Sequence, residues 1–151
     1  MWYSKIVSDL SLLPDFISHY ENELMQAKKE VKIFGNIEKN LASMPGLVET
    51  RFSELQEIEA VLNWMNIQLR KLRRTHFQKY LEGYNRALTS RDAEKYVDGE
   101  ASVIDYEVLI NDVALLRNRY LGVIKALENK SFSLSSISKL RTAGMEDSTI
   151  G

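Results

Sequence analysis

Residues 55–72 read LQEIEAVLNWMNIQLRKL, and their apolar side chains recur at alternating steps of three and four. Steps that average about 3.5 residues keep one side of a helix apolar, as in a coiled coil. The pattern predicts an amphipathic helix over about residues 48–81, roughly 50 Å long. Val61, Trp64 and Ile67 lie off this seam and form a second apolar face, which favours a bundle or an oligomer. The seam positions are Leu55, Ile58, Leu62, Met65, Leu69 and Leu72.

A second long helix is expected before this one. Pro14 and Asp15 are suited to its first turn, where proline sacrifices no hydrogen bond and an acid is favoured by the helix dipole. Its apolar positions continue in steps of three and four to Leu41, with Gly35 weakening the middle. Residues 44–46, Met-Pro-Gly, are expected to end it, because proline disfavours helix in the residue before it.

The sequence pattern of the C-terminal half of the chain predicts a short helix and a third long helix. Residues 89–92 read TSRD, a capping box that opens a short helix to about Val97. The third long helix is expected over residues 100–127 and to stop at residues 129–130. Residues 131–140 are rich in serine, yet their apolar side chains are spaced for a short amphipathic turn or helix.

These patterns predict an all-α protein whose long amphipathic helices form a helical bundle or coiled-coil-like subunit. We divide the chain into an N-terminal helical arm (1–46), a main helical region (47–144) and a tail expected to be disordered (145–151). A length of 151 residues suits one domain. No apolar run approaches the roughly 18 residues of a spanning helix, and the first residues lack a signal-peptide pattern, so a cytoplasmic protein is expected.

The composition leaves little chemistry for catalysis. The chain has no cysteine, which excludes disulfides, thiolate metal sites and cysteine nucleophiles. Neither His19 nor His76 follows a glutamate by three residues, as a helical di-metal site would need. The seven glycines are scattered and form no phosphate-cradling loop. A serine–histidine–acid arrangement stays open on sequence alone, but we expect no enzyme, no metal and no cofactor.

The formal net charge of −1 conceals one strongly basic segment. Residues 70–91 carry seven basic side chains against Glu82 alone, a local charge of +6, whereas residues 1–69 and 92–151 carry −4 and −3. Charges closer than a Debye length, about 10 Å, reinforce one another, so this segment attracts an anion. The alternative is that it pairs with the acidic flanks of the same or a neighbouring subunit.

Aromatic rings alternate with the cations in this segment, where residues 70–84 read RKLRRTHFQKYLEGY. Single-stranded nucleic acid needs both, because cations contact its phosphates and rings stack on its bases. Phe77, Tyr80 and Tyr84 recur at steps of three and four, which places them on one side of a helix, although each ring can equally belong to a core. The predicted DNA-binding residues are Arg70, Lys71, Arg73, Arg74, His76, Phe77, Lys79, Tyr80, Tyr84 and Arg86.

In this segment and toward the C-terminus, the sequence resembles the UvsY family of phage recombination mediators. The likeness begins with KLR at residues 71–73 and an aromatic run that closes with YLEG at residues 80–83. EKYV at residues 94–97 then leads into the third long helix, and NKSFSLSSI at residues 129–137 is similar to the end of the family's sequences. The pieces follow in order, with similar spacing, over roughly residues 65–144.

The resemblance implies a non-enzymatic accessory protein that binds single-stranded DNA as a ring-like homo-oligomer. It would help to load a RecA-like recombinase onto strands covered by single-strand-binding protein, in phage recombination and DNA repair within the host cell. Lys71 and Arg73, with Arg74 beside them, match the family's basic motif, and the third long helix with its C-terminal end matches the part used for assembly. The residues expected in assembly are Leu109, Val113, Leu116, Tyr120, Val123, Phe132, Leu134 and Ile137.

Two other classes of protein stay open. One is a helical scaffold that binds no DNA and whose basic segment only pairs with acidic arms. The other is a small regulator that binds duplex DNA, although the sequence contains no short helix-turn-helix with an exposed recognition helix.

Overall fold

The computed structural model describes residues 1–83 and 88–144, and every regular element within them is helical. The elements are α1 (Trp2–Ser8), the 3₁₀ turn η1 (Leu10–Leu12), α2 (Leu13–Glu30), α3 (Ile37–Gly83), α4 (Ser90–Asp98) and α5 (Ala101–Thr142). Helices α3 and α5 have 47 and 42 residues. At about 1.5 Å per residue they are roughly 70 and 60 Å long. The prediction of an all-α protein is confirmed for the described part of the chain.

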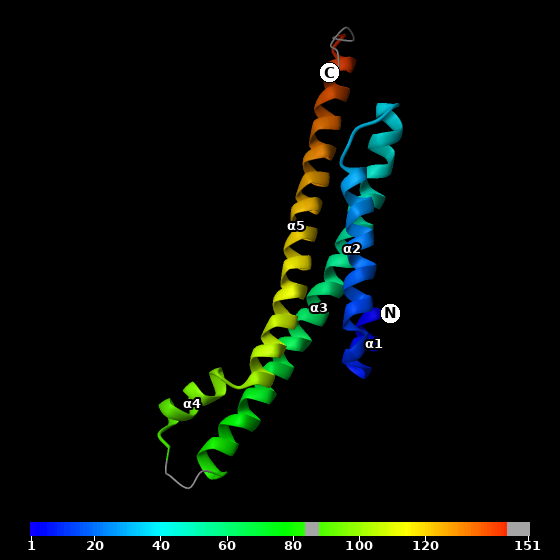
Figure 1. Cartoon of the computed structure of the whole chain (residues 1–151). Helices are drawn as coiled ribbons and strands as arrows, with labels where there is room; N and C mark the ends of the chain where they lie inside the picture. Colours follow the sequence, from blue (N-terminus) through cyan, green and yellow to red (C-terminus); the bar gives the residue numbers. More distant parts are fainter. Residues whose placement is uncertain (84–87, 145–151) are drawn as a thin grey trace.

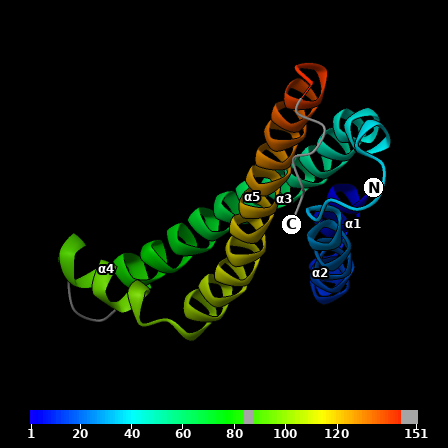
Figure 2. The same cartoon turned by 90° about the horizontal axis from the view of Figure 1, so that it is seen from above.

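Helices α3 and α5 lie side by side and run in opposite directions (Figure 1). Seen from above, α5 crosses α3 at an angle (Figure 2). Helix α2 lies beside the first half of α3 and packs against α5, whereas α4 lies beside the last turns of α3 and the start of α5. We call the two ends of the α3–α5 pair the α2 end and the α4 end.

The main apolar core lies between α1, α2, α3 and α5. Leu69 and Leu72, the last two positions of the predicted seam, are only half-buried, because α2 does not extend to that part of α3 (Figure 1). At the α4 end, three apolar side chains are buried apart from the main core: Ala93, Val97 and Val103. The other four seam positions are buried, as their spacing predicts: Leu55, Ile58, Leu62 and Met65.

The predicted helix end at residues 44–46 is wrong. Pro45 lies inside α3, and the break comes earlier, in residues 31–36. Gly35 has a φ of 63° there, which glycine adopts without strain. The Asn36 side chain accepts hydrogen bonds from the backbone N–H groups two and three residues later, at 2.8 and 3.2 Å, and so caps α3. The boundary drawn at residue 46 therefore falls inside α3.

The predicted stop of the third long helix at residues 129–130 is wrong, because α5 continues to Thr142. Neither proline nor glycine occurs between residues 123 and 142, so nothing in this stretch breaks the helix. Leu134 is still buried in the main core, which means that packing supports the helix beyond the expected stop. The segment expected as a separate short turn or helix is thus part of α5.

Lys130 joins α5 to the end of α2. Its ammonium group donates hydrogen bonds to the backbone carbonyls of Glu30, at 2.7 Å, and Lys32, at 3.0 Å. Carbonyls at a helix C-terminus lack partners within the helix, and a cation is favoured there by the dipole. Burial of the amine lowers the pKa of Lys130 below its ordinary value, although the nearby carboxylate of Glu30 acts to raise it.

The predicted short helix is confirmed as α4. Thr89 precedes it, and its hydroxyl accepts a hydrogen bond from the backbone N–H of Asp92 at 3.2 Å, as the capping pattern predicts. The tail predicted over residues 145–151 lies outside the described residues. Within the described ranges, no helix is both long enough and apolar enough to cross a membrane.

Candidate nucleic-acid interface

The predicted DNA-binding residues lie on the last turns of α3, beside α4 and the start of α5 (Figure 1). Tyr84 and Arg86 fall outside the described residues. The side chains exposed to solvent are Arg70, Lys71, Arg74 and Lys79. Those that are half-buried are Arg73, His76, Phe77 and Tyr80. The basic segment therefore divides into an outer and an inner set.

Three of the exposed cations form one surface, which we call the open cation face: Arg70, Lys71 and Arg74. Arg70 and Arg74 are four residues apart, and Lys71 and Arg74 are three apart, so all three are neighbours on the helix surface. None of the ion pairs among the described residues involves any of them. Lys79 lies nine positions after Arg70, which at about 100° per residue places it on the side of α3 opposite Arg70 and roughly 80° round the helix from Lys71.

Arg73 is held by carboxylates of its own chain. One terminal nitrogen, Nη2, lies 2.5 Å from Oδ1 of Asp98 at the end of α4, and the other, Nη1, lies 3.5 Å from Oε1 of Glu107 on α5. Its charge is therefore largely compensated within the chain. The sequence left open whether the basic segment pairs with the acidic flanks of the chain, and Arg73 does so. Arg73 is also one of the two residues, with Lys71, that match the basic motif of the family.

His76 and Tyr80 contact the start of α5 and α4. Nε2 of His76 lies 2.9 Å from Oγ of Ser102, and its Nδ1 lies 3.6 Å from Oε1 of Glu100. The Tyr80 hydroxyl donates a hydrogen bond to Oε2 of Glu100. The Tyr80 ring also stacks on Tyr96, with ring centroids 5.3 Å apart and planes inclined by 24°. Tyr80, one of the rings predicted to stack on bases, is therefore already in contact with groups of its own chain.

A pocket of about 280 Å³ lies between α3 and α4. Arg73, Arg74 and Phe77 line it from α3, and Glu94 and Val97 line it from α4. Glu94 is exposed, and it joins none of the ion pairs among the described residues. The pocket thus combines an aromatic ring, an uncompensated cation and an uncompensated carboxylate.

The residues predicted for assembly lie mostly inside one chain. Leu109 and Ile137 are half-buried at the edge of the main core, and Phe132 is 75% exposed. The other five are buried in the main core: Val113, Leu116, Tyr120, Val123 and Leu134. These five hold α5 against the other helices of the same subunit. A role for the set in assembly stays a prediction, and its most exposed member is Phe132.

A buried ionic cluster at the α2 end is absent from the sequence predictions. Arg51 on α3 is 7% exposed, and its guanidinium contacts Glu23 (2.7 Å), Glu30 (2.6 Å) and Glu54 (2.8 Å). The Tyr120 hydroxyl donates to Glu54 at 2.7 Å. Burial acts to lower the pKa of Arg51, but the hydrogen bonds that its guanidinium donates to the three carboxylates outweigh this effect and raise that pKa. The feature of the sequence that could have indicated this cluster is the position of Arg51, four residues before Leu55 and therefore on the same side of the helix as the seam.

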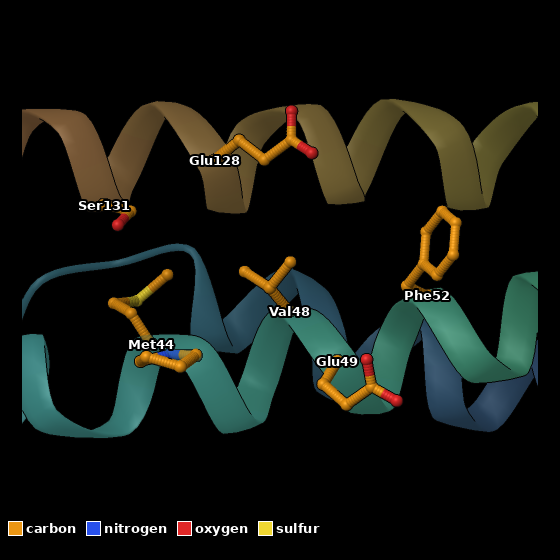
Figure 3. Close-up of a pocket in the computed structure, with 7 residues that line it drawn as sticks. Met44, Val48, Glu49, Phe52, Glu128 and Ser131 are labelled. Carbon is orange, nitrogen blue, oxygen red and sulfur yellow. The ribbon is translucent and has the colours of Figure 1, made fainter.

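Another pocket, of about 480 Å³, lies between α3 and α5 at the α2 end (Figure 3). Val48 and Phe52 project from α3 toward α5, and Glu49 and Glu128 lie at its sides (Figure 3). Its walls are apolar and its charged residues are acidic, so it is unsuited to a polyanion. This contrast leaves the α4 end as the candidate nucleic-acid interface.

Within the described residues, no group of three or more histidine, aspartate or glutamate side chains is arranged to hold a metal ion. Comparisons with protein-family models, with curated proteins and with solved structures found no match for this chain.

Proposed function

We propose that this protein is a recombination mediator that binds single-stranded DNA through the open cation face. Its partners would be a RecA-like recombinase, which it helps to load, and the single-strand-binding protein that covers the strand in phage recombination and repair. The observation that supports DNA binding is the set of three adjacent cations, Arg70, Lys71 and Arg74, left without carboxylate partners within the described chain. The mediator role rests on the family resemblance.

The size of the cation face sets the expected strength of binding. Each phosphate neutralised on a single strand contributes a slope of about −0.7 to log affinity against log salt, so three cations give roughly −2 per subunit. Such binding is weak at physiological salt for one subunit. A homo-oligomer that presents several faces to one strand gains affinity through effective concentration, which is the advantage of a ring.

The test compares wild type with the triple variant Arg70→Ala, Lys71→Ala, Arg74→Ala. Fluorescence anisotropy with a labelled single-stranded oligonucleotide, over a series of salt concentrations, gives affinity and slope. The variant is expected to lose most of the affinity and to flatten the slope by about two per subunit. A matched control replaces three exposed cations of α5, Arg119, Lys125 and Lys139, with alanine and is expected to bind as wild type. Equal binding by the two triple variants would overturn the proposal.

The mediator role needs a second assay. Wild type is expected to speed filament formation by a RecA-like recombinase on a strand already covered by single-strand-binding protein. The cation-face variant should fail in this assay, while the α5 control variant should retain activity. Binding of DNA without any effect on loading would leave the DNA-binding part of the proposal and remove the mediator part.

A helical scaffold that binds no DNA is the second candidate. The pairing of Arg73 with Asp98 and Glu107 favours it, because part of the basic segment is neutralised within the chain. This candidate predicts no binding of wild type to the oligonucleotide even at low salt, where phosphate contacts are strongest.

A further inference from the structure

The pocket between α3 and α4 offers a binding site beside the open cation face, in addition to the proposed contacts with DNA phosphates. It is lined by Arg73, Arg74, Phe77, Glu94 and Val97, and it adjoins the open cation face because Arg74 belongs to both. Pockets for drug-sized ligands are roughly 300 to 1,000 Å³. At about 280 Å³, this one suits a single flat ring better than a whole cofactor.

The charges of the pocket are arranged for a ligand with two kinds of polar group. Arg74 and Glu94 both line it, yet they do not form an ion pair within 4.0 Å. Arg73 is already held by Asp98 and Glu107. The pocket therefore leaves one cation for an anion and one carboxylate for a hydrogen-bond donor.

The apolar wall supplies the third requirement. Phe77 is half-buried, so part of its ring stays accessible, and Val97 beside it is buried. A flat ring placed there can stack on the phenyl group, an interaction available to every nucleobase. A ligand that combines an anion, a flat ring and a donor on the ring edge is a nucleotide whose base carries an exocyclic amino group.

We propose that this pocket is a nucleobase subsite that prefers cytosine over thymine. The base lies against Phe77, its phosphate lies on Arg74, and its N4 amino group donates a hydrogen bond to the Glu94 carboxylate. Thymine presents the O4 carbonyl at the same position, which places an acceptor against a carboxylate. The inference rests on the proposed function, and it adds a base preference to binding that is otherwise set by phosphates.

The test uses oligodeoxycytidine and oligothymidine of equal length, at mildly alkaline pH so that cytosine stays unprotonated. Wild type is expected to bind the cytosine strand roughly fivefold more tightly, at both low and high salt, because the contact with Glu94 releases no counterions. Glu94→Gln removes the charge and is expected to bring the ratio close to one. Asp92→Asn is the matched control, since Asp92 is an exposed acid of α4 that does not line the pocket, and it should keep the ratio.

Phe77→Leu tests the ring separately. It should weaken binding of both strands by a similar factor and leave the salt slope unchanged, because stacking does not displace counterions. A steeper or flatter slope in this variant would show that Phe77 acts by positioning the cations and would overturn its role as a stacking surface.

The outcomes separate this inference from the function on which it rests. Equal binding of the two strands by wild type, or a ratio that survives Glu94→Gln, would overturn the subsite while leaving phosphate binding intact. Failure of wild type to bind either strand would overturn the proposed function itself. If free deoxycytidine monophosphate bound as tightly as the strand, the pocket would be a site for free nucleotides and the proposal would again be wrong.

Discussion

The two ends of the α3–α5 pair are held together by different chemistry. At the α2 end, helices α1, α2, α3 and α5 enclose an apolar core and a buried ionic cluster around Arg51. At the α4 end, three small apolar side chains are buried, and the polar contacts are partly open to water, as for Arg73 with Asp98 and Tyr80 with Glu100. The same pair of helices thus has one end suited to stability and one end whose contacts can be exchanged for contacts with a ligand.

Solvent exposure explains the difference in strength between the two sets of ion pairs. The Arg51 side chain is 8% exposed and its partner Glu54 is 16% exposed, whereas Arg73 and Asp98 are 32% and 64% exposed. Exposed pairs contribute about 0 to 1 kcal/mol, while breaking a buried pair costs about 3 to 5 kcal/mol. Water already competes for Arg73, so a phosphate can do so as well.

The largest effect is expected from a charge placed in the core of the α2 end. Leu116→Asp buries an unpaired carboxylate at a position that is 2% exposed and should abolish the cooperative folded state, measured by circular dichroism. Leu115→Asp, at the adjacent position that is 51% exposed, should cost roughly 1 kcal/mol at most. A folded Leu116→Asp variant that loses only its assembly would show that this residue lies between subunits instead.

The next effect tests the ionic cluster. Arg51→Ala leaves Glu23, Glu30 and Glu54 without their shared cation, so the free energy of unfolding should fall by about 3 to 5 kcal/mol in urea titrations. Arg91→Ala, an exposed cation of α4, is the control and should change stability by about 0.5 kcal/mol or less. Similar losses in both variants would contradict the contrast between the two ends.

A smaller effect depends on pH. Burial, with help from Glu54, raises the pKa of Tyr120 above its ordinary value of 10.0. Because the pKa of Tyr120 is higher in the folded state than in the unfolded state, the protonated hydroxyl stabilises the fold fully below about pH 10. This stabilisation is lost as the pH rises above about 10. Tyr120→Phe should be less stable than wild type by about 1 to 2 kcal/mol at neutral pH.

The gap between wild type and Tyr120→Phe should then narrow above about pH 10, since only wild type has this hydroxyl to ionise. Tyr20 and Lys130, whose pKa values are also shifted, are present in both proteins and cancel in the comparison. Urea titrations at neutral and alkaline pH measure the gap. A gap that stays constant would show that the Tyr120 hydroxyl does not titrate differently in the folded state.

The smallest effect on stability is expected at the α4 end. Asp98→Asn combined with Glu107→Gln releases Arg73 and should cost about 1 kcal/mol or less. If Arg73 then joins the open cation face, the slope of log affinity against log salt should steepen by about 0.7. The control, Asp92→Asn with Asp105→Asn, removes two negative charges from exposed acids that do not contact Arg73. It should tighten binding but leave the slope unchanged, because Arg73 stays paired. Equal slopes would mean that Arg73 stays unavailable to DNA.

Local patterns in the sequence predicted local structure well. The seam of α3 and the Thr89 cap of α4 depend on residues a few positions apart. The cap and four of the six seam positions are as predicted, whereas Leu69 and Leu72 are only half-buried. Pro45 misled the prediction because its effect on the helix is outweighed by the Asn36 cap and by the packing of Met44 in the core. The stop expected at residues 129–130 was wrong for a related reason, since tertiary packing continues beyond it.

The candidate site was predictable only in part. The sequence shows that the segment is basic, and three of its cations are indeed exposed on one surface. It does not show that Arg73 meets Asp98 and Glu107, because that contact requires the chain to reverse direction between α3 and α5. The Arg51 cluster was missed for the same reason, since Glu23 and Glu30 come from a different helix.

Helix α5 follows α1, α2 and α3 in the chain, which has a consequence for folding during synthesis. The Tyr120 hydroxyl lies 3.3 Å from the Tyr20 carbonyl, and Lys130 donates a hydrogen bond to the Glu30 carbonyl, so each contact joins residues 100 positions apart. Helices α1, α2 and α3 leave the ribosome first, and the parts of their core faces that pack against α5 have no cover until α5 emerges. The nascent chain therefore carries an open apolar surface until α5 emerges, and exposed surface of this kind promotes aggregation and attracts chaperones.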